Sequence, residues 1–250
     1  MTPWYMNLHR YLEKKKEITK RSLAHAPREM CFRCFRAKKS CLCKNIKPFS
    51  TNAHFVILMH PKEARRERNG TGRLAELCLE NARIEVGIDF TQNPVVNTLL
   101  NNPGLYPLLL YPGVHSINIS EKGFPPFLRE EKKLLFFIMD GTWSLAKKII
   151  TRSKNLHSLP KIAFTPENPS RFIIKRQPTA CCLSTIEALH TLLKLLERTG
   201  LETLKGRHRI LIQACDSLVN YQLACIKNNR VQGFRRSPFE VPHNILPTVK

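Results

Sequence analysis

The segment LLFFIMDGTW ends a run of apolar residues with an acidic one, Asp140, and Thr142 and Trp143 follow within three positions. A carboxylate at the end of a buried strand can act as a general base when a substrate proton comes within hydrogen-bonding reach. A simpler interpretation is that Asp140 or Thr142 caps the helix that begins near Ser144. Both interpretations place these residues at a strand–helix junction, so the neighbouring elements must decide between them.

Two other apolar segments, AHFVILMH and YPLLLYPG, also end in polar or turn-forming residues. The residues HPKE end or follow the first segment, and YPG ends the second. Because ligands of parallel α/β sheets bind outside the carboxyl ends of the strands, we expect these residues and Asp140 to converge on one pocket. The chain has no GxGxxG motif and no P-loop, which disfavours a dinucleotide or nucleoside triphosphate held in the usual way.

The elements that must position these residues alternate between strands and helices. Apolar runs predict strands at residues 53–60, 106–113, 134–140 and 161–165. Helical spacing of apolar residues predicts helices at residues 72–83, 144–152 and 183–200. In the last of these, Ser184 and Glu187 have the spacing of a capping box and Gly200 that of a C-cap. The alternation predicts an α/β domain with a mostly parallel sheet flanked by helices.

A cluster of cysteines indicates a metal site near the N-terminus. Four of the nine cysteines lie within thirteen residues, at Cys31, Cys34, Cys41 and Cys43. Four soft thiolates with no open position favour a structural Zn²⁺, against the alternatives of a redox pair or an accidental cluster. Basic residues between these cysteines would suit contacts with phosphate: Arg33, Arg36, Lys38 and Lys39.

The charge of the chain indicates a polyanionic partner. Lys and Arg number 41 against 19 Asp and Glu, which gives a formal net charge of +22. A surplus of this size favours nucleic acid, because neutralising phosphates releases condensed counterions. No apolar run approaches the roughly 20 residues that a membrane span needs, and the first residues lack the apolar core of a signal peptide. We therefore expect a cytoplasmic protein without a disulfide framework.

The organisation predicted from these patterns has three parts. Residues 1–29 form a basic helical extension whose apolar side chains share one face. Residues 30–48 form the zinc-binding segment, and residues 49–250 form the catalytic α/β domain.

Several motifs, taken together and in order, resemble one family. MDGTWSLAKKI and NPSRFIIKRQPTACCLSTIEAL resemble the DTW-domain family, which is named for its Asp-x-Thr-Trp motif and has a Ser-Thr-x-Glu-Ala stretch as a second hallmark. MHPKEARRERNGTGRLA, LLYPG and the cysteine cluster continue the similarity, so that it covers roughly residues 30–200. The resemblance implies a SPOUT-like knotted sheet. It also implies transfer of the 3-amino-3-carboxypropyl group of S-adenosylmethionine to N3 of a tRNA uridine, which releases methylthioadenosine.

The resemblance also assigns roles to residues. Asp140 is expected to be the general base, beside Thr142 and Trp143; Trp143 either stacks on a ring of a ligand or, more simply, packs in the core. Arg73 or Arg176 is expected to pair with the carboxylate of S-adenosylmethionine. Ser184, Thr185 and Glu187 are expected to complete the pocket through its ammonium group. The implied cofactor pocket consists of Thr71, Arg73, Tyr111, Pro112, Gly113, Arg176, Ser184, Thr185 and Glu187.

Two other functions compete with this expectation. An RNA methyltransferase would use the same cofactor, and a zinc-containing RNA-binding protein would have no catalytic activity. In all three cases an RNA is the expected partner, and for the favoured activity it is tRNA. The sequence predicts no membrane partner and no obligate protein partner, and it is compatible with an oligomer.

Overall fold

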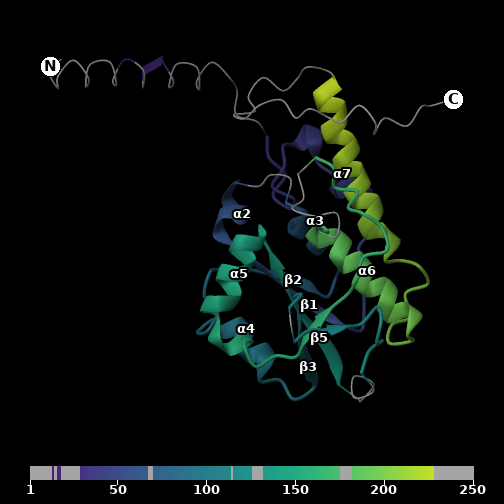
Figure 1. Ribbon diagram of the computed structural model, residues 1–250. Coiled ribbons are helices and arrows are strands. Elements are labelled where there is room, and N and C mark those ends of the chain that lie inside the picture. The colour runs from purple at the N-terminus through teal and green to yellow at the C-terminus, as the bar shows by residue number, and fades with distance from the viewer. Residues whose placement is uncertain are drawn as a thin grey trace, which may run out of the picture. The chain divides into compact units, whose positions relative to one another are not determined.

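The computed structural model describes residues 13, 16, 17, 29–66, 70–113, 115–125, 132–174 and 182–227, with the side chain of Arg66 excepted (Figure 1). Most of the predicted N-terminal extension lies outside the described residues, and so does Arg176. The chain divides into two compact units, residues 1–41 and 42–250. Among the described residues, no helix has the length and apolar character needed to cross a membrane.

The second unit is built on a six-stranded sheet. Its strands are β1 (His54–Met59), β2 (Ala82–Val86), β3 (Leu105–Leu110), β4 (Ile117–Asn118), β5 (Lys133–Asp140) and β6 (Lys161–Ala163). They lie in the order β2-β1-β5-β3-β6-β4, and every neighbouring pair is parallel. The predicted parallel α/β sheet is therefore confirmed. The continuous apolar runs of β1 and β5 place these strands at the centre, where both faces are covered.

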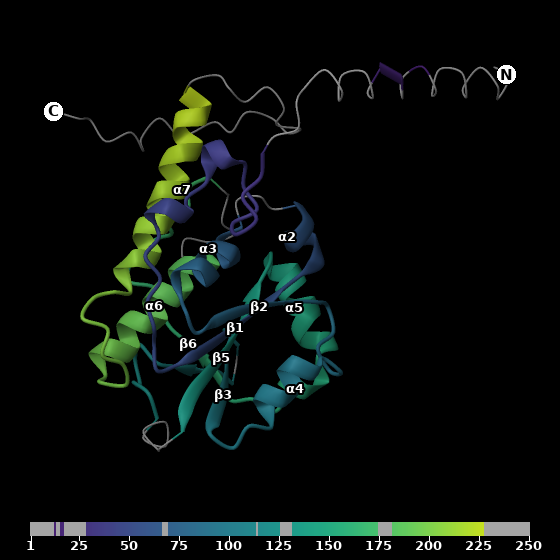
Figure 2. The same ribbon diagram turned by 180° about the vertical axis from the view of Figure 1, so that it is seen from behind.

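Helices cover the two faces of this sheet. They are α2 (Pro61–Arg66), α3 (Thr71–Cys78), α4 (Pro94–Leu100), α5 (Trp143–Arg152), α6 (Thr185–Arg198) and α7 (Arg209–Lys227), with short 3-10 turns at Lys38–Ser40, Cys43–Asn45 and Lys154–Leu156. Figures 1 and 2 show α3, α6 and α7 on one face and α4 and α5 on the other. Each group of helices encloses its own apolar core against the sheet.

The central strand β5 contributes to both cores by alternation. Its residues Leu134, Phe136 and Ile138 belong to the core under α3, α6 and α7. The intervening residues Leu135, Phe137 and Met139 belong to the core under α4 and α5. Because side chains on a strand alternate between faces, the next residue of the first series, Asp140, lies on the face of α3 and α6. The alternation of β5 therefore determines which helices its terminal carboxylate meets.

Two helix boundaries differ from those predicted. The helix predicted over residues 72–83 ends at Cys78, and its last two residues begin β2. The prediction was wrong because the edge strand β2 is only partly buried and has no continuous apolar run. Helix α5 begins at Trp143 rather than Ser144, with Thr142 at the N-cap position. Asp140 is therefore not a helix cap.

The start and end of α6 are as predicted. Ser184 is the N-cap, and the Glu187 carboxylate accepts a hydrogen bond from the Ser184 backbone N–H at 2.9 Å, as in a capping box. Gly200 follows the C-terminus with a φ of 76°, a left-handed conformation that glycine adopts without steric cost. These caps fix the first turn of α6, which bears Thr185, at one end of the sheet.

Candidate active site

Asp140, the last residue of β5, lies where three elements meet. Its side chain is buried, with 6% of the residue exposed. A Cβ atom placed on Gly72, in the first turn of α3, would lie 2.6 Å from Oδ2 and 2.7 Å from Cγ of Asp140. Only a glycine leaves room for the carboxylate at this position. The first turn of a helix carries partial positive charge, so this location favours an ionised carboxylate.

The third element at this carboxylate is α6. The hydroxyl of Thr185, the first residue of α6, donates a hydrogen bond to Oδ1 of Asp140 at 2.5 Å. Hydrogen bonds to a charged acceptor are shorter and stronger than those between neutral groups. The structure thus joins the DGTW and STIEA motifs, which lie 45 residues apart, through one direct contact.

Trp143 and Tyr111 form an aromatic pair at the ends of β3 and β5. Their ring centroids are 6.3 Å apart, with the planes tilted by 57°. Trp143 is 43% exposed, because α5 turns Ala146 and Ile149 toward the core instead. Trp143 is therefore only partly packed, and its stacking on a ring of a ligand stays a prediction. Burial raises the pKa of the Tyr111 hydroxyl, so this phenol stays neutral. The pair presents a partly exposed aromatic surface where Tyr111 packs against the core under α4 and α5.

The loop after β3 is held by a short turn. The Gly113 N–H donates to Oγ of Ser116 at 3.0 Å, and that hydroxyl donates to the Gly113 carbonyl at 2.7 Å. A Cβ on Gly113 would meet no atom within 4 Å, so the turn leaves open space above it. The backbone N–H of Tyr111 donates to the Ile162 carbonyl and anchors the loop to β6. Tyr111, Pro112 and Gly113 thus lie at a strand end, as predicted.

Two polar residues of α3 flank Gly72, the residue that lies against Asp140. Thr71 is buried, with 7% exposed. Arg73 is half-buried, and its Nη2 donates to the Ala64 carbonyl at 3.1 Å, which ties α3 to α2. Of the two arginines expected to pair with a cofactor carboxylate, Arg73 lies on the helix that contacts Asp140, and Arg176 lies outside the described residues.

Glu187 has several protein donors. Its carboxylate accepts from the Ser184 hydroxyl at 2.6 Å, from the Ser170 hydroxyl at 2.7 Å and from the Arg171 backbone N–H at 2.6 Å, besides the capping bond. These bonds fasten the segment before Phe172 to the start of α6. The geometry gives Glu187 a structural task, and its contact with a cofactor ammonium group stays a prediction.

His60 is a further candidate site residue. The sequence places it only within the HPKE segment at a strand end and assigns it no role. It follows β1, whose last residue Met59 pairs with Asp140 of β5, and it is 3% exposed. Its Nδ1 accepts a hydrogen bond from the Lys62 N–H at 3.1 Å, so the proton of the neutral ring is on Nε2. Among the described residues Nε2 has no partner. Burial, with smaller effects from Lys148 and Lys62, lowers the pKa of His60 and keeps it a neutral donor.

The four clustered cysteines have the geometry of a metal site. Their sulfur atoms all lie within 4.8 Å of one another. The sulfurs of Cys34 and Cys41 are 3.8 Å apart, close to the roughly 3.8 Å edge of a tetrahedron with Zn–S bonds of about 2.3 Å. Hydrogen bonds from the backbone N–H groups of Cys34 and Arg33 lower the pKa of the Cys31 thiol to about 6, which favours the thiolate form that binds metals.

Comparison with known proteins gives a consistent result. A family model described as the DTW domain matches residues 28–223. The chain is 30% and 32% identical to proteins named tRNA-uridine aminocarboxypropyltransferase 2 from Macaca fascicularis and Mus musculus, over 69% and 70% of its length. It spans only 58% and 59% of the length of these two relatives. A protein of the same name from Drosophila melanogaster is 30% identical over 78% of this chain and 76% of its own length. No solved structure matches the chain.

Proposed function

The chain belongs to the DTW-domain family, and on this premise we propose that it transfers the 3-amino-3-carboxypropyl group of S-adenosylmethionine to N3 of a tRNA uridine. Three relatives bear the name of this activity. The observation that carries the proposal is the meeting of three family motifs at one buried carboxylate, that of Asp140. A general base is what the reaction requires, because the uridine N3–H must lose its proton before it can attack.

In the proposed reaction, the bond between sulfur and the aminocarboxypropyl methylene breaks, the N3–carbon bond forms, and the sulfur keeps the electron pair. S-adenosylmethionine supplies a sulfonium leaving group, so no acid is needed on that side. Asp140 accepts the N3 proton. Thr185 holds the carboxylate by its 2.5 Å hydrogen bond, and Gly72 leaves the space that the carboxylate occupies. The Thr142 carbonyl accepts a hydrogen bond from the Ala146 N–H at 2.8 Å, and its hydroxyl lies 3.1 Å from that of Ser144, so Thr142 would hold the turn between β5 and α5.

The residues at the strand ends fit an adenosyl cofactor. The Tyr111–Trp143 pair offers a partly exposed aromatic surface for adenine. Pro112 and Gly113 would line the pocket after β3, where a Cβ on Gly113 would meet open space. Arg73 or Arg176 would pair with the carboxylate of the cofactor through the fork of its guanidinium group. Thr71, Ser184, Thr185 and Glu187 would complete the pocket from the first turns of α3 and α6.

His60 extends this proposal to the other substrate. When uridine loses its N3 proton, negative charge spreads onto the uracil carbonyl oxygens. A neutral Nε2–H that lacks a protein partner among the described residues is a donor suited to such an oxygen. We propose this role for His60 because its backbone N–H bonds to the Asp140 carbonyl at 3.1 Å, so the two residues end neighbouring strands. The His60 Cβ lies on the side of Gly141 and α5, so the uracil would extend from Asp140 toward that side.

The order of the strands supports both the site and the knotted fold. From β1 the chain first adds β2 on one side, then forms β3, and only later inserts β5 between β1 and β3. A crevice at such a switch in strand order is where open α/β sheets bind ligands. Insertion of a late strand between two earlier ones is also compatible with a SPOUT-like knot, which we propose for this domain.

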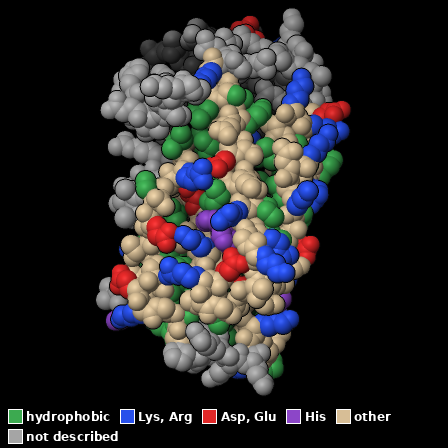
Figure 3. Space-filling model, turned by 90° about the vertical axis from the view of Figure 1, so that its right-hand side faces the viewer, with side chains coloured by type: hydrophobic (Ala, Val, Ile, Leu, Met, Phe, Trp, Pro, Cys, Tyr) green, Lys and Arg blue, Asp and Glu red, His purple; other side chains and the backbone are tan. Residues whose placement is uncertain are grey.

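The proposed partner is tRNA, held by basic surfaces. Figure 3 shows one face of the molecule on which Lys and Arg side chains outnumber acidic ones. Exposed residues of α6 and α7 and of the connection between them include Arg198, Lys205, Arg207 and Arg209. Such surfaces attract phosphates independently of base sequence. Zinc bound by Cys31, Cys34, Cys41 and Cys43 would stiffen a further basic segment.

Incubation of the purified chain with S-adenosylmethionine and tRNA tests the activity. We expect methylthioadenosine as by-product and, by mass spectrometry, an aminocarboxypropyl group on uridine. S-adenosylhomocysteine with a methylated base would indicate the competing methyltransferase. Asp140→Asn should lower the rate by about 10²–10⁴-fold. Absence of both products with intact tRNA binding would favour a non-catalytic RNA-binding protein.

A further inference from the structure

Two phenylalanines beside the cysteine ligands project from the surface. Phe32 is 87% exposed and Phe35 is 51% exposed, and no other large hydrophobic residue of the described chain is as exposed as either. They flank Cys34, which is only 5% exposed. Isolated exposed apolar residues are common, but two neighbouring aromatic rings on one short loop form a surface that a partner can recognise.

The backbone conformation of Phe35 is one that normally favours glycine over a residue with a side chain. Its φ is 55°, in the left-handed region that a Cβ atom makes unfavourable and that glycine adopts freely. Two hydrogen bonds impose this turn: Phe35 N–H donates to the Cys31 carbonyl at 2.8 Å, and Cys31 N–H donates to the Arg36 carbonyl at 2.7 Å. The loop therefore bears a half-exposed aromatic ring at a position whose backbone conformation favours glycine, as is seen at functional positions.

The charges around these rings indicate the chemistry of the partner. Arg33, Lys38 and Lys39 are exposed on the same loop. Lys38 forms an ion pair with Glu29 at 3.0 Å, and Glu29 is the one acidic residue between positions 29 and 41. Aromatic rings interleaved with basic side chains suit a strand that offers both phosphates and flat apolar faces. An apolar protein surface would offer Arg33 and Lys39 no anionic group.

We propose that Phe32 and Phe35 form a stacking site for unpaired bases of an RNA, with Arg33, Lys38 and Lys39 contacting its phosphates. The identity of the partner as RNA rests on the proposed function. Bases in a duplex keep their faces covered, whereas bases in loops and single strands can stack on aromatic side chains. The loop would thus add a contact to a single-stranded part of the substrate, besides the uridine that reacts.

This inference can be tested by measuring how tightly the full chain binds a fluorescently labelled oligouridylate. The metal content of the protein is measured in the same samples. We expect Phe32→Ala to weaken binding by roughly 5- to 150-fold, the range of one lost base stack. The slope of log affinity against log salt should stay the same, since no phosphate contact is removed. Lys38→Gln with Lys39→Gln should instead flatten that slope. Phe32→Trp should retain affinity, and its indole fluorescence should be quenched when RNA binds.

Phe35→Gly separates a binding role from a folding role. It removes the ring and relieves the left-handed backbone, so we expect unchanged or higher stability together with weaker RNA binding. Ile226→Ala is the matched control, because Ile226 is 48% exposed on α7 and lies outside the loop. Wild-type affinity in both Phe32→Ala and Phe35→Gly would overturn the inference. If both variants bind RNA as tightly as the wild type and the wild-type protein releases methylthioadenosine, the stacking site is rejected and the proposed activity stands. If the variants bind RNA more weakly but the wild-type protein releases no methylthioadenosine, the stacking site is supported and the proposed activity is rejected.

Discussion

The carboxylate of Asp140 lies directly against the α-carbon of Gly72, so that a Cβ atom there would be 2.6 Å from Oδ2. These residues are 68 positions apart, and the contact joins the end of β5 to the first turn of α3. It explains why a glycine, usually unfavourable inside a helix, occupies this position. A substitution at Gly72 therefore tests whether activity depends on the position of the Asp140 carboxylate.

Gly72→Ala should move the Asp140 side chain without unfolding the protein. Alanine normally stabilises a helix by about 0.5–1 kcal/mol relative to glycine, but here its methyl group would occupy the place of the carboxylate. A displacement of about 1 Å can reduce a rate by about 100-fold. Methylthioadenosine release measures the rate, and urea unfolding checks the fold. Gly104→Ala is the control, because its Cβ would approach only the Asn102 side chain, at 3.3 Å.

Thr185→Val should lower activity while Thr185→Ser preserves it. Valine has nearly the shape of threonine but cannot donate to Asp140 Oδ1. A hydrogen bond to a charged group contributes about 1.5–3 kcal/mol, so we expect a decrease of about ten-fold or more. The rates of both variants in the same methylthioadenosine assay decide the point. Equal rates for valine and serine would show that the hydroxyl does not orient the carboxylate.

His60→Leu should reduce turnover by about 10²–10³-fold, the usual effect of removing one donor that stabilises developing charge. The side chain is neutral and buried, so the loss reflects the N–H donor rather than a charge. Single-turnover rates with saturating tRNA measure it. His115→Leu, at an exposed position, serves as control. A rate equal to wild type would mean that Nε2 serves no substrate atom.

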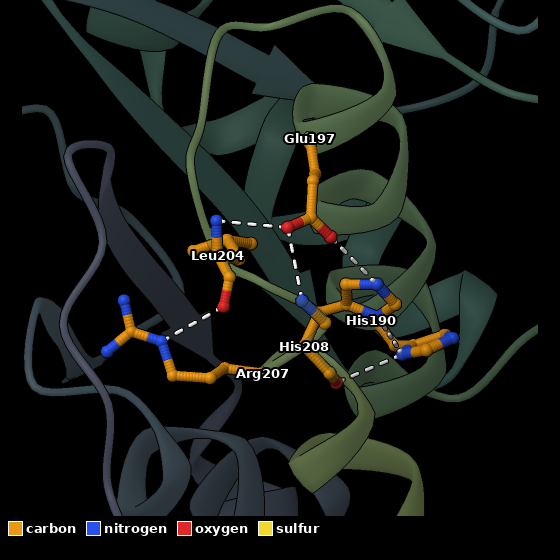
Figure 4. Close-up of polar contacts among 6 residues, drawn as sticks. His190, Glu197, Leu204, Arg207 and His208 are labelled. Atoms are coloured by element: carbon orange, nitrogen blue, oxygen red, sulfur yellow. Dashed lines mark hydrogen bonds and ion pairs between the residues drawn. The ribbon is translucent and has the colours of Figure 1, made fainter.

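The stability of the chain should fall as the pH drops below about 6.5, the ordinary pKa of histidine. His190 of α6 and His208 before α7 form a chain of contacts with Glu197 (Figure 4). The two Nδ1 atoms are 3.2 Å apart, and His208 Nε2 lies 3.2 Å from Glu197 Oε2. Burial is the main cause that lowers the pKa of both rings; Lys194 lowers both further, Arg171 lowers His190, and Arg209 lowers His208.

The sign of this effect follows from proton linkage. With folded pKa values below the unfolded one, the unfolded chain binds more protons as the pH falls from about 6.5 through the folded values, so unfolding becomes easier in that window. Urea midpoints between pH 8 and 5.5 measure the trend. His190→Gln should make the midpoint less dependent on pH, and the exposed His115→Gln should not. A midpoint that rises on acidification would contradict the prediction.

The zinc content of the protein should depend on the four clustered cysteines and not on a cysteine elsewhere in the chain. Cys31→Ser should reduce the metal content from about one zinc per chain to nearly none, because a structural site needs its four ligands. Cys225→Ser, on α7 and outside the cluster, should leave the content unchanged. Elemental analysis of protein purified without added metal provides the measurement. A native protein without zinc would contradict the structural-metal prediction.

The sequence by itself determined the features that depend on residues close together in the chain. Apolar runs predicted β1 and β5, the Ser184–Glu187 spacing predicted the cap of α6, and the cysteine spacing predicted a four-sulfur cluster. Each depends on residues close together in the chain, where period and spacing directly reflect backbone geometry. The order of family motifs likewise identified the residues worth testing.

Only the tertiary structure decided what these residues touch. The strand order places β5 between β1 and β3, and no local pattern encodes that order. It determines that Asp140 faces α3 and α6, where it meets Gly72 and Thr185, while Trp143 is left partly exposed. The edge strand β2 was missed for the same reason, because it is stabilised by pairing with β1 rather than by a pattern of its own. Contacts between distant segments arise from packing, which local spacing does not specify.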